Sequence, residues 1–300
     1  MKTTSPSSSV WSQPRTLAGA HRGSPNGTIE NSFLAISEAL NSGAKLLEVD
    51  VHESKDHVVV LSHDRNCKRL FNYPMPIIDC YYYGELDKLR SVAYPHTPLA
   101  TLYEVLDLLE EDEYKDVKII LDVKSTNGVG IFKAMADTFA EHKEERFLGR
   151  VMVGISNVNY LPYFDEHMPS FQLQHIGASV SYAKKFLDHP RLTSFSMLKY
   201  FYLSGQGRHF TQDCLKSSIK MYAWTVNDAP MVHFLCRNNV TGIISDNYVK
   251  TTNYIEDYYN GHCETWTFGQ RIRLSVMSVV FSYVLVPVIQ WYRAGGFRKV

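Results

Sequence analysis

Ionisable residues recur where short apolar runs end in the first half of this 300-residue chain. They are His21 and Arg22, Glu48 and Asp50, His63, and Asp122 and Lys124. Two of these pairs have members two positions apart, and such residues share one face of a β-strand. Three carboxylates, two histidines and two fixed cations at strand ends form a set suited to phosphodiester cleavage.

The three acidic residues predict a metal site. Carboxylates this close would repel by about 4 kcal/mol at 4 Å and an effective dielectric of roughly 20, so either some protonate or a cation joins them. We expect Glu48, Asp50 and Asp122 to hold one divalent cation. Oxygen ligands favour Mg²⁺, with Ca²⁺ or Mn²⁺ as alternatives, over zinc.

The remaining residues of the set suggest how a phosphodiester would be handled. Arg22 and Lys124 can bind phosphate and hold its charge as it grows in the transition state. His21 and His63 are then available as general base and general acid. Folding alone does not account for the set, because burying such groups unpaired would cost several kcal/mol each.

Composition limits the other classes of function. The 31 basic and 31 acidic residues cancel, so we expect no nucleic-acid partner. The five cysteines lack any Cys-x-x-Cys pair, which indicates a reducing compartment and no structural zinc. With 45 % hydrophobic residues the chain can bury a substantial core.

Short β-type runs alternate with helical patterns along the chain. The runs are residues 17–21, 46–51, 118–123, 151–155, 171–176, 195–200, 221–226 and 242–245. Helical spacing is found in residues 29–40, 102–109, 131–142, 212–219 and 231–237. Eight apolar strands with helical crossovers predict an α/β fold, a TIM-type (βα)8 barrel. An open doubly wound sheet is the alternative, but no Gly-x-Gly-x-x-Gly turn supports it.

One strand-like run, residues 58–61, does not fit this alternation. Only four residues separate it from the second strand, which is too few for a helical crossover. We therefore expect an extra β-hairpin after strand 2, which would return His63 to the level of Asp50.

Several short motifs together resemble one enzyme family. H-R-G stands at residues 21–23, E-N-S at 30–32, E-V-D at 48–50, H-D at 63–64 and D-V-K at 122–124, with W-T-V-N at 224–227 and I-S-D at 244–246. In this combination they are similar to the glycerophosphodiester phosphodiesterase family, over about residues 16–258. The resemblance implies a TIM-type barrel, a divalent-metal site and lipid-related phosphodiester substrates.

The resemblance also implies roles. It makes His21 and His63 the acid/base pair, Arg22 and Lys124 the phosphate contacts, and Trp224 a substrate-pocket residue. It makes Glu48, Asp50 and Asp122 the metal ligands. The chain departs from the family pattern at two positions, with Ser32 where Thr is usual and Asp122 where Glu is common. Ser keeps the hydroxyl, but the shorter Asp leaves the identity of the metal more open.

The C-terminal part changes character. Residues 274–292 contain no charge and are bracketed by arginines, and a helix of that length would span about 28 Å. We expect a C-terminal hydrophobic membrane-anchoring helix, either spanning or lying in the interface. The predicted layout is a disordered leader at 1–15, a catalytic barrel at 16–258, a linker at 259–273, the anchor at 274–292 and a basic tail at 293–300.

A membrane anchor shifts the expected substrate toward intact phospholipid. Within the family, a barrel with one short hydrophobic tail most resembles the fungal phospholipases C that act on phosphatidylglycerol, whose products are diacylglycerol and glycerol phosphate. The alternatives are a glycerophosphodiester phosphodiesterase or lysophospholipase D, and, more remotely, an inactive membrane-tethered lipid-binding protein. We expect membrane association with the barrel in the cytosol, at the endoplasmic reticulum, mitochondrial surface or lipid droplet.

Overall fold

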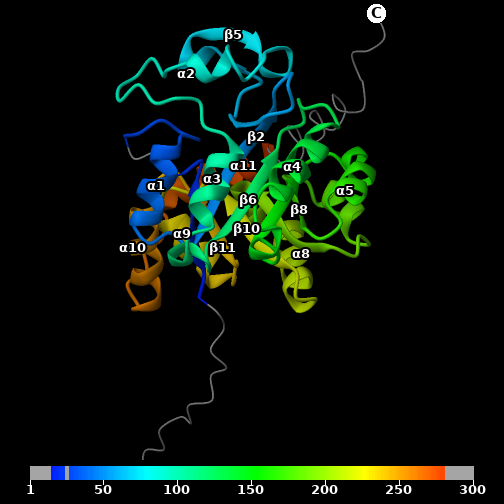
Figure 1. The fold of residues 1–300 in the computed structure, drawn as a ribbon. Helices are drawn as coiled ribbons and strands as arrows, with labels where there is room; N and C mark the ends of the chain where they lie inside the picture. The colour runs from blue at the N-terminus through cyan, green and yellow to red at the C-terminus, as the bar shows by residue number, and fades with distance from the viewer. Residues whose placement is uncertain (1–14, 24–26, 281–300) are drawn as a thin grey trace, which may run out of the picture.

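Eight parallel strands form a closed barrel at the centre of the molecule, in a computed structural model that describes residues 15–23 and 27–280 (Figure 1). The strands are β1 (Leu17–His21), β2 (Leu46–Glu53), β6 (Lys118–Val123), β7 (Val151–Ile155), β8 (Gln172–Gly177), β9 (Leu192–Leu198), β10 (Lys220–Trp224) and β11 (Gly242–Ser245). Strand β1 pairs with both β11 and β2, which closes the sheet on itself. The predicted barrel is confirmed.

Helices cover the outside of the barrel. They are α1 (Phe33–Asn41), α3 (Leu102–Leu109), α4 (Ile131–Ala140), α5 (Leu161–His167), α6 (Val180–Ala183), α7 (Lys199–Leu203), α8 (Gly205–Lys216), α9 (Ala229–Arg237) and α10 (Tyr248–Tyr259). Side-chain caps fix several starts: Thr101 and Glu104 form a capping box on α3, and Ser204 accepts from the Gly207 N–H on α8. The sequence pattern missed that cap, so it began this helix too late, at residue 212, and it extended the sixth predicted strand, residues 195–200, into α7.

The predicted hairpin is present and opens into a cap. Strand β3 (Val59–Leu61) pairs antiparallel with the end of β2. Residues 62–101 then form a small layer above the barrel mouth, drawn at the top of Figure 1. This layer contains β4 (Asn66–Cys67), the short helix α2 (Lys68–Phe71) and β5 (Tyr73–Pro76), over a buried cluster that includes Ile77 and Leu86.

Strand periodicity separates an apolar barrel floor from an ionised mouth. Leu46 belongs to the small apolar cluster inside the barrel, and Glu48 and Asp50 lie two and four positions further along the same face. Ile120 belongs to the same cluster, two positions before Asp122. The intervening residues pack outward against the helices in the main core. The carboxylates of β2 and β6 therefore lie toward the carboxyl ends of these strands, where TIM-type barrels place their sites.

The C-terminal helix α11 (Phe268–Val280) differs from the predicted anchor. It begins inside the region expected to be a linker and packs against α7 on the side of the barrel. Among the described residues, no helix is long and apolar enough to cross a membrane. The predicted spanning helix is therefore not supported. Residues 281–292 of the predicted anchor, the basic tail at 293–300 and residues 1–14 of the predicted leader lie outside the described residues.

Candidate active site

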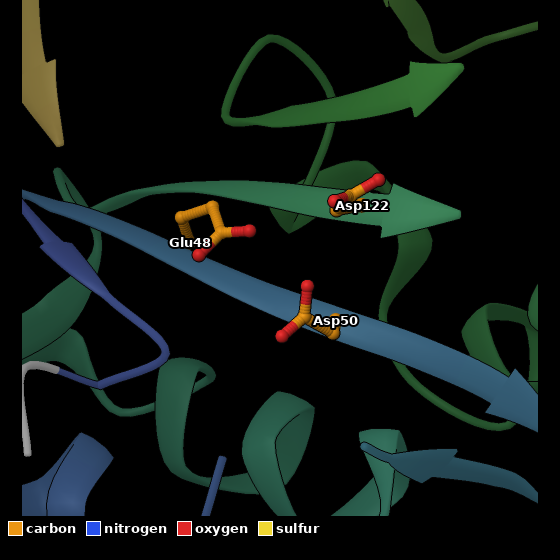
Figure 2. A group of neighbouring side chains, drawn as sticks. All are labelled: Glu48, Asp50 and Asp122. Atoms are coloured by element: carbon orange, nitrogen blue, oxygen red, sulfur yellow. The ribbon is translucent and has the colours of Figure 1, made fainter. Parts of the chain in front are cut away.

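Three carboxylates meet at the barrel mouth (Figure 2). Glu48 and Asp50 come from β2 and Asp122 from β6, and the register of these strands sets Asp50 directly beside Asp122. One oxygen from each carboxylate can be chosen so that all three lie within 4.8 Å of one another. Glu48 and Asp50 are buried, and Asp122 is only slightly more accessible. The structure thus brings together all three predicted metal ligands.

Two cations and an amide surround Asp50. Lys124 places Nζ 2.5 Å from Asp122 Oδ2 and also contacts Asp50. Arg22 Nε lies 3.2 Å from Asp50 Oδ2, and the Asn31 side-chain amide donates to the same oxygen at 2.8 Å. Arg22 and Asn31 both have left-handed backbone, with φ near 55°, which turns the segment after β1 back over β2.

The electrostatics of the three carboxylates differ. Burial and the neighbouring Asp50 charge raise the pKa of Glu48 to about 7. Burial also acts to raise the pKa of Asp50, but Lys124 and Arg22 outweigh it and lower the value to about 2. Burial raises the pKa of Asp122 despite the contact with Lys124. The two cations therefore hold Asp50 ionised but do not compensate the whole cluster.

This arrangement fits a divalent cation. The donor set is three carboxylates, which are the hard oxygen ligands that Mg²⁺, Ca²⁺ and Mn²⁺ prefer. Beyond the effect of burial, the charges of Asp50 and Asp122 also raise the pKa of Glu48, so a cation bound here would relieve repulsion within the cluster. A bound divalent cation would supply the compensating positive charge, and Glu48, Asp50 and Asp122 would hold that cation.

The carboxylate of Asp246, which directly follows strand β11, fixes the orientation of His21. Its Nδ1 lies 2.5 Å from Asp246 Oδ1, and Asp246 also accepts from the Asn227 amide at 2.7 Å. The other ring nitrogen, Nε2, is 3.9 Å from Glu48 Oε2 and faces the carboxylate cluster. Burial lowers the pKa of His21, but the bond to Asp246 and the charge of Glu48 outweigh it, so the pKa is raised. An imidazole held in this way can accept a proton at Nε2.

His63 reaches the mouth from the cap side. Its Nδ1 is 2.8 Å from Asp64 Oδ1, and Arg69 Nε donates to the other Asp64 oxygen at 2.7 Å. Arg69 also binds Glu30, which in turn binds Arg22. A continuous series of ion pairs therefore connects the cap histidine to the carboxylate cluster. Each histidine has a carboxylate at Nδ1, which leaves Nε2 for chemistry.

Trp224 ends β10 on the inner side of the barrel. Its indole N–H donates to the Ser196 carbonyl at 3.0 Å, and its ring packs on the apolar cluster that fills the barrel interior. The ring thus covers the apolar floor close to the mouth, where a substrate-pocket wall is expected.

Four residues of the site were not assigned roles from the sequence. They are Glu30, Asn31, Asn227 and Asp246. Three of the short motifs contain them, so the signal was present in E-N-S, W-T-V-N and I-S-D. Their partners are set by contacts between distant segments, such as the 225 positions that separate His21 from Asp246.

A family model described as the glycerophosphoryl diester phosphodiesterase family matches residues 21–250. The chain belongs to this family. Its members are phosphoric diester hydrolases and in general depend on a divalent metal, which agrees with the carboxylate cluster. The family match does not show the fungal phosphatidylglycerol-specific subtype that the sequence led us to expect.

Individual glycerophosphodiester phosphodiesterases are similar over most of the chain. One from Caldanaerobacter subterraneus is 25% identical over 242 residues, which cover 77% of this chain and 94% of that protein. A lysophospholipase D of Mus musculus is 29% identical, over 42% of this chain and 41% of its own length.

Solved structures share the fold. A phosphodiesterase of Oleispira antarctica, in complex with the product sn-glycerol-3-phosphate, matches with a TM-score of 0.69 and 19% identity, over 81% of this chain and 97% of that one. The Thermotoga maritima glycerophosphodiester phosphodiesterase has a TM-score of 0.65 and 22% identity, over 80% of this chain and 97% of its own.

Proposed function

We propose that this family member cleaves phosphatidylglycerol in the manner of a phospholipase C, releasing diacylglycerol and glycerol phosphate. The observation that carries the step from phosphodiester to intact lipid is the uncharged run of residues 274–292, which starts on helix α11. A soluble diester would not require such a run after the barrel in the sequence.

The described part of that run already exposes apolar side chains. Phe268, Ile272, Val276 and Val279 are exposed and lie on one face of α11 by their spacing. Other side chains of the helix, including Met277, line a cavity with Tyr200 and Asp228, which follow the carboxyl ends of β9 and β10. The helix therefore reaches the mouth end of the barrel. We propose that a membrane surface covers this face, at the endoplasmic reticulum, mitochondrial surface or lipid droplet, with the barrel in the cytosol.

The proposed reaction uses the two histidines on opposite sides of phosphorus. The glycerol headgroup has a hydroxyl adjacent to the phosphate ester, and His21 Nε2 would remove its proton as the oxygen attacks phosphorus. His63 would protonate the diacylglycerol oxygen as its bond to phosphorus breaks. The cyclic glycerol phosphate that results would then be hydrolysed by water. Arg22 and Lys124 would hold the non-bridging oxygens throughout.

The metal in this proposal is Mg²⁺, with Ca²⁺ or Mn²⁺ as alternatives. When bound, such a cation neutralises a non-bridging phosphate oxygen as negative charge grows. Because the pKa of Glu48 is about 7 without metal, binding must displace its proton below that pH. Calorimetric titration in buffers of different ionisation enthalpy should show a released proton at about pH 6 and almost none at about pH 8.5. Proton release that is equal at both pH values would contradict this role for Glu48.

A lipid panel tests the substrate and the bond together. Purified protein is incubated with phosphatidylglycerol or phosphatidylethanolamine and one metal at a time, and the products are read by mass spectrometry. We expect diacylglycerol and glycerol phosphate from phosphatidylglycerol only, since the ethanolamine headgroup lacks the attacking hydroxyl. His21→Gln serves as the inactive control. Equal turnover of both lipids would rule out internal attack.

The second candidate is a glycerophosphodiester phosphodiesterase or lysophospholipase D. It is favoured by the similarity to proteins with those names and would use the same residues. Its cut leaves phosphate on the glycerol backbone side and releases the free headgroup alcohol. With lysophosphatidylcholine and glycerophosphocholine added to the panel, release of free choline together with lysophosphatidic acid or glycerol 3-phosphate, and no diacylglycerol from phosphatidylglycerol, would replace the first proposal with the second.

A further inference from the structure

A polar cleft of about 740 Å³ adjoins the site between the cap and the loop after β6. Its lining residues are His63, Asp64, Arg65, Asn66, Lys68, Arg69, Asn72, Lys124, Ser125 and Thr126. His63 and Lys124 belong both to this cleft and to the candidate active site, so the cleft lies directly beside the site. None of the ten lining residues is apolar, so the cleft offers an acyl chain no hydrophobic side chain to pack against.

The charge of the cleft is positive and only partly compensated. Arg69 is paired with Glu30 and Asp64, and Lys124 is paired with two carboxylates of the cluster. Arg65 and Lys68 are exposed, and the part of the chain that the structure describes offers neither of them an ion pair. Two cations without partners thus face a cavity that already leads to a phosphate-handling site.

We infer that this cleft binds a second phosphate group beside the scissile phosphodiester, with Arg65 and Lys68 as its specificity-determining residues. The inference rests on the proposed function, because it takes the catalytic site to hold a phosphate. A phosphomonoester dianion suits two unpaired cations better than a neutral or zwitterionic headgroup, since each charge-assisted contact strengthens with the charge of the acceptor. Neutral donors such as Asn66 and Ser125 can complete the oxygen contacts.

The second phosphate can come from two sources with the same chemistry. It can be part of the substrate molecule, as on a phosphorylated glycerol headgroup, or it can be a separate anion, such as free phosphate or the headgroup of a neighbouring lipid. The protein offers the same two cations in either case, so the experiment must separate the sources.

Calorimetric binding to the full chain in Mg²⁺ tests the cleft without turnover. The probes are glycerol 3-phosphate and glycerol 1,3-bisphosphate, neither of which is a diester that the site could cleave. We expect the bisphosphate to bind at least about tenfold more tightly, in line with one or two added charge-assisted contacts. The double variant Arg65→Gln/Lys68→Gln should bring the two affinities within about threefold of each other. Lys216→Gln, which removes an exposed lysine at the end of α8, should keep the wild-type ratio.

A second arm identifies the source. If the bisphosphate is not preferred but inorganic phosphate binds to the glycerol 3-phosphate complex, and the double variant loses this, then the second anion is a separate one. The cleft proposal is overturned if wild type shows neither effect, or if the double variant keeps the effect that wild type shows. Failure of phosphatidylglycerol cleavage in the lipid panel would instead refute the proposed function, because these binding measurements require no cleavage.

Discussion

The two halves of the site are built in opposite ways. On the barrel side, Glu48, Asp50 and Asp122 extend from neighbouring strands and are almost fully buried. On the cap side, His63 and Asp64 lie in a loop. Their side chains are 38% and 34% exposed. The closely spaced carboxylates are held by paired strands, whereas the cap supplies groups that remain in contact with water.

This difference has an energetic meaning. A buried carboxylate that loses its partners costs about 3–5 kcal/mol, whereas an exposed ion pair contributes about 0–1 kcal/mol. The barrel half should therefore be sensitive to any change of charge. The cap half should tolerate such changes structurally and respond mainly through catalysis.

The largest effect is expected when a carboxylate is neutralised on the barrel side. Asp50→Asn removes a metal ligand and the shared partner of Arg22 and Lys124. We expect kcat/KM to fall by about 10⁴-fold, since a metal contributes several kcal/mol to the transition state. Asp64→Asn, the cap-side counterpart, should cost about 10-fold to 100-fold. Steady-state kinetics with metal at saturation measures both, and comparable losses would remove the distinction between the halves.

The next effect separates the two histidines by role. His21→Gln and His63→Gln should each lower kcat by about 10³-fold, within the usual range for a general acid or base. A p-nitrophenyl ester of glycerol phosphate needs no protonation of its leaving group. It should restore most of the rate to the His63 variant and none to the His21 variant. Rescue of both variants, or of the His21 variant alone, would show that the roles are assigned wrongly.

A smaller effect concerns the carboxylate behind His21. Asp246→Asn should cost about 10-fold to 100-fold, because the ring loses the partner that fixes its orientation. The bond to Asp246 raises the pKa of His21, and a base works only when it is unprotonated. The acidic limb of the rate profile should therefore move to lower pH in the variant. Arg69→Gln, which acts on the cap histidine through Asp64, is the matched comparison and should leave that limb in place.

Much of the barrel half could be predicted from the sequence, for a physical reason. Period-two alternation in a buried strand fixes which residues share a face, so Glu48 and Asp50 could be paired from their spacing alone. The same rule paired Asp122 with Lys124. The hairpin that brings His63 to the mouth also followed from the length of a connection, because four residues cannot form a crossover.

The cap half could not be predicted in the same way. Arg69 binds Glu30 and Asp64 through loop conformations that no periodic pattern encodes.

Two features outside the cap could not be predicted from the sequence either. Asp246 contacts His21 only because the barrel closes between its first and last strands. The hydrophobicity of residues 274–292 was visible, but its first residues proved to be part of a helix that packs on α7. A hydrophobic run alone does not show whether its side chains contact another helix or a membrane, because that depends on how the run packs.

The smallest effect is expected where the barrel half contacts the cap half, a contact that we call the seam. His52 is buried at the end of β2, where Nδ1 donates to the Ser62 carbonyl and Nε2 accepts from the Thr126 hydroxyl. These contacts connect the segment before His63 to the loop after Lys124. Burial lowers the pKa of His52 to about 4, so the folded state keeps the ring neutral.

The sign of the pH dependence follows from this shift. An unfolded histidine titrates near 6.5, so between about pH 4 and 6.5 the unfolded chain binds one proton more than the folded one. The free energy of unfolding should rise with pH in that window, by about 1.4 kcal/mol per pH unit from this residue. His52→Gln should remove that part of the slope, with a few-fold loss of activity. Urea unfolding at several pH values measures this slope, with His209→Gln as the control because the side chain of His209 is exposed on α8. An unchanged slope in the His52 variant would mean that the seam does not depend on a neutral imidazole at this position.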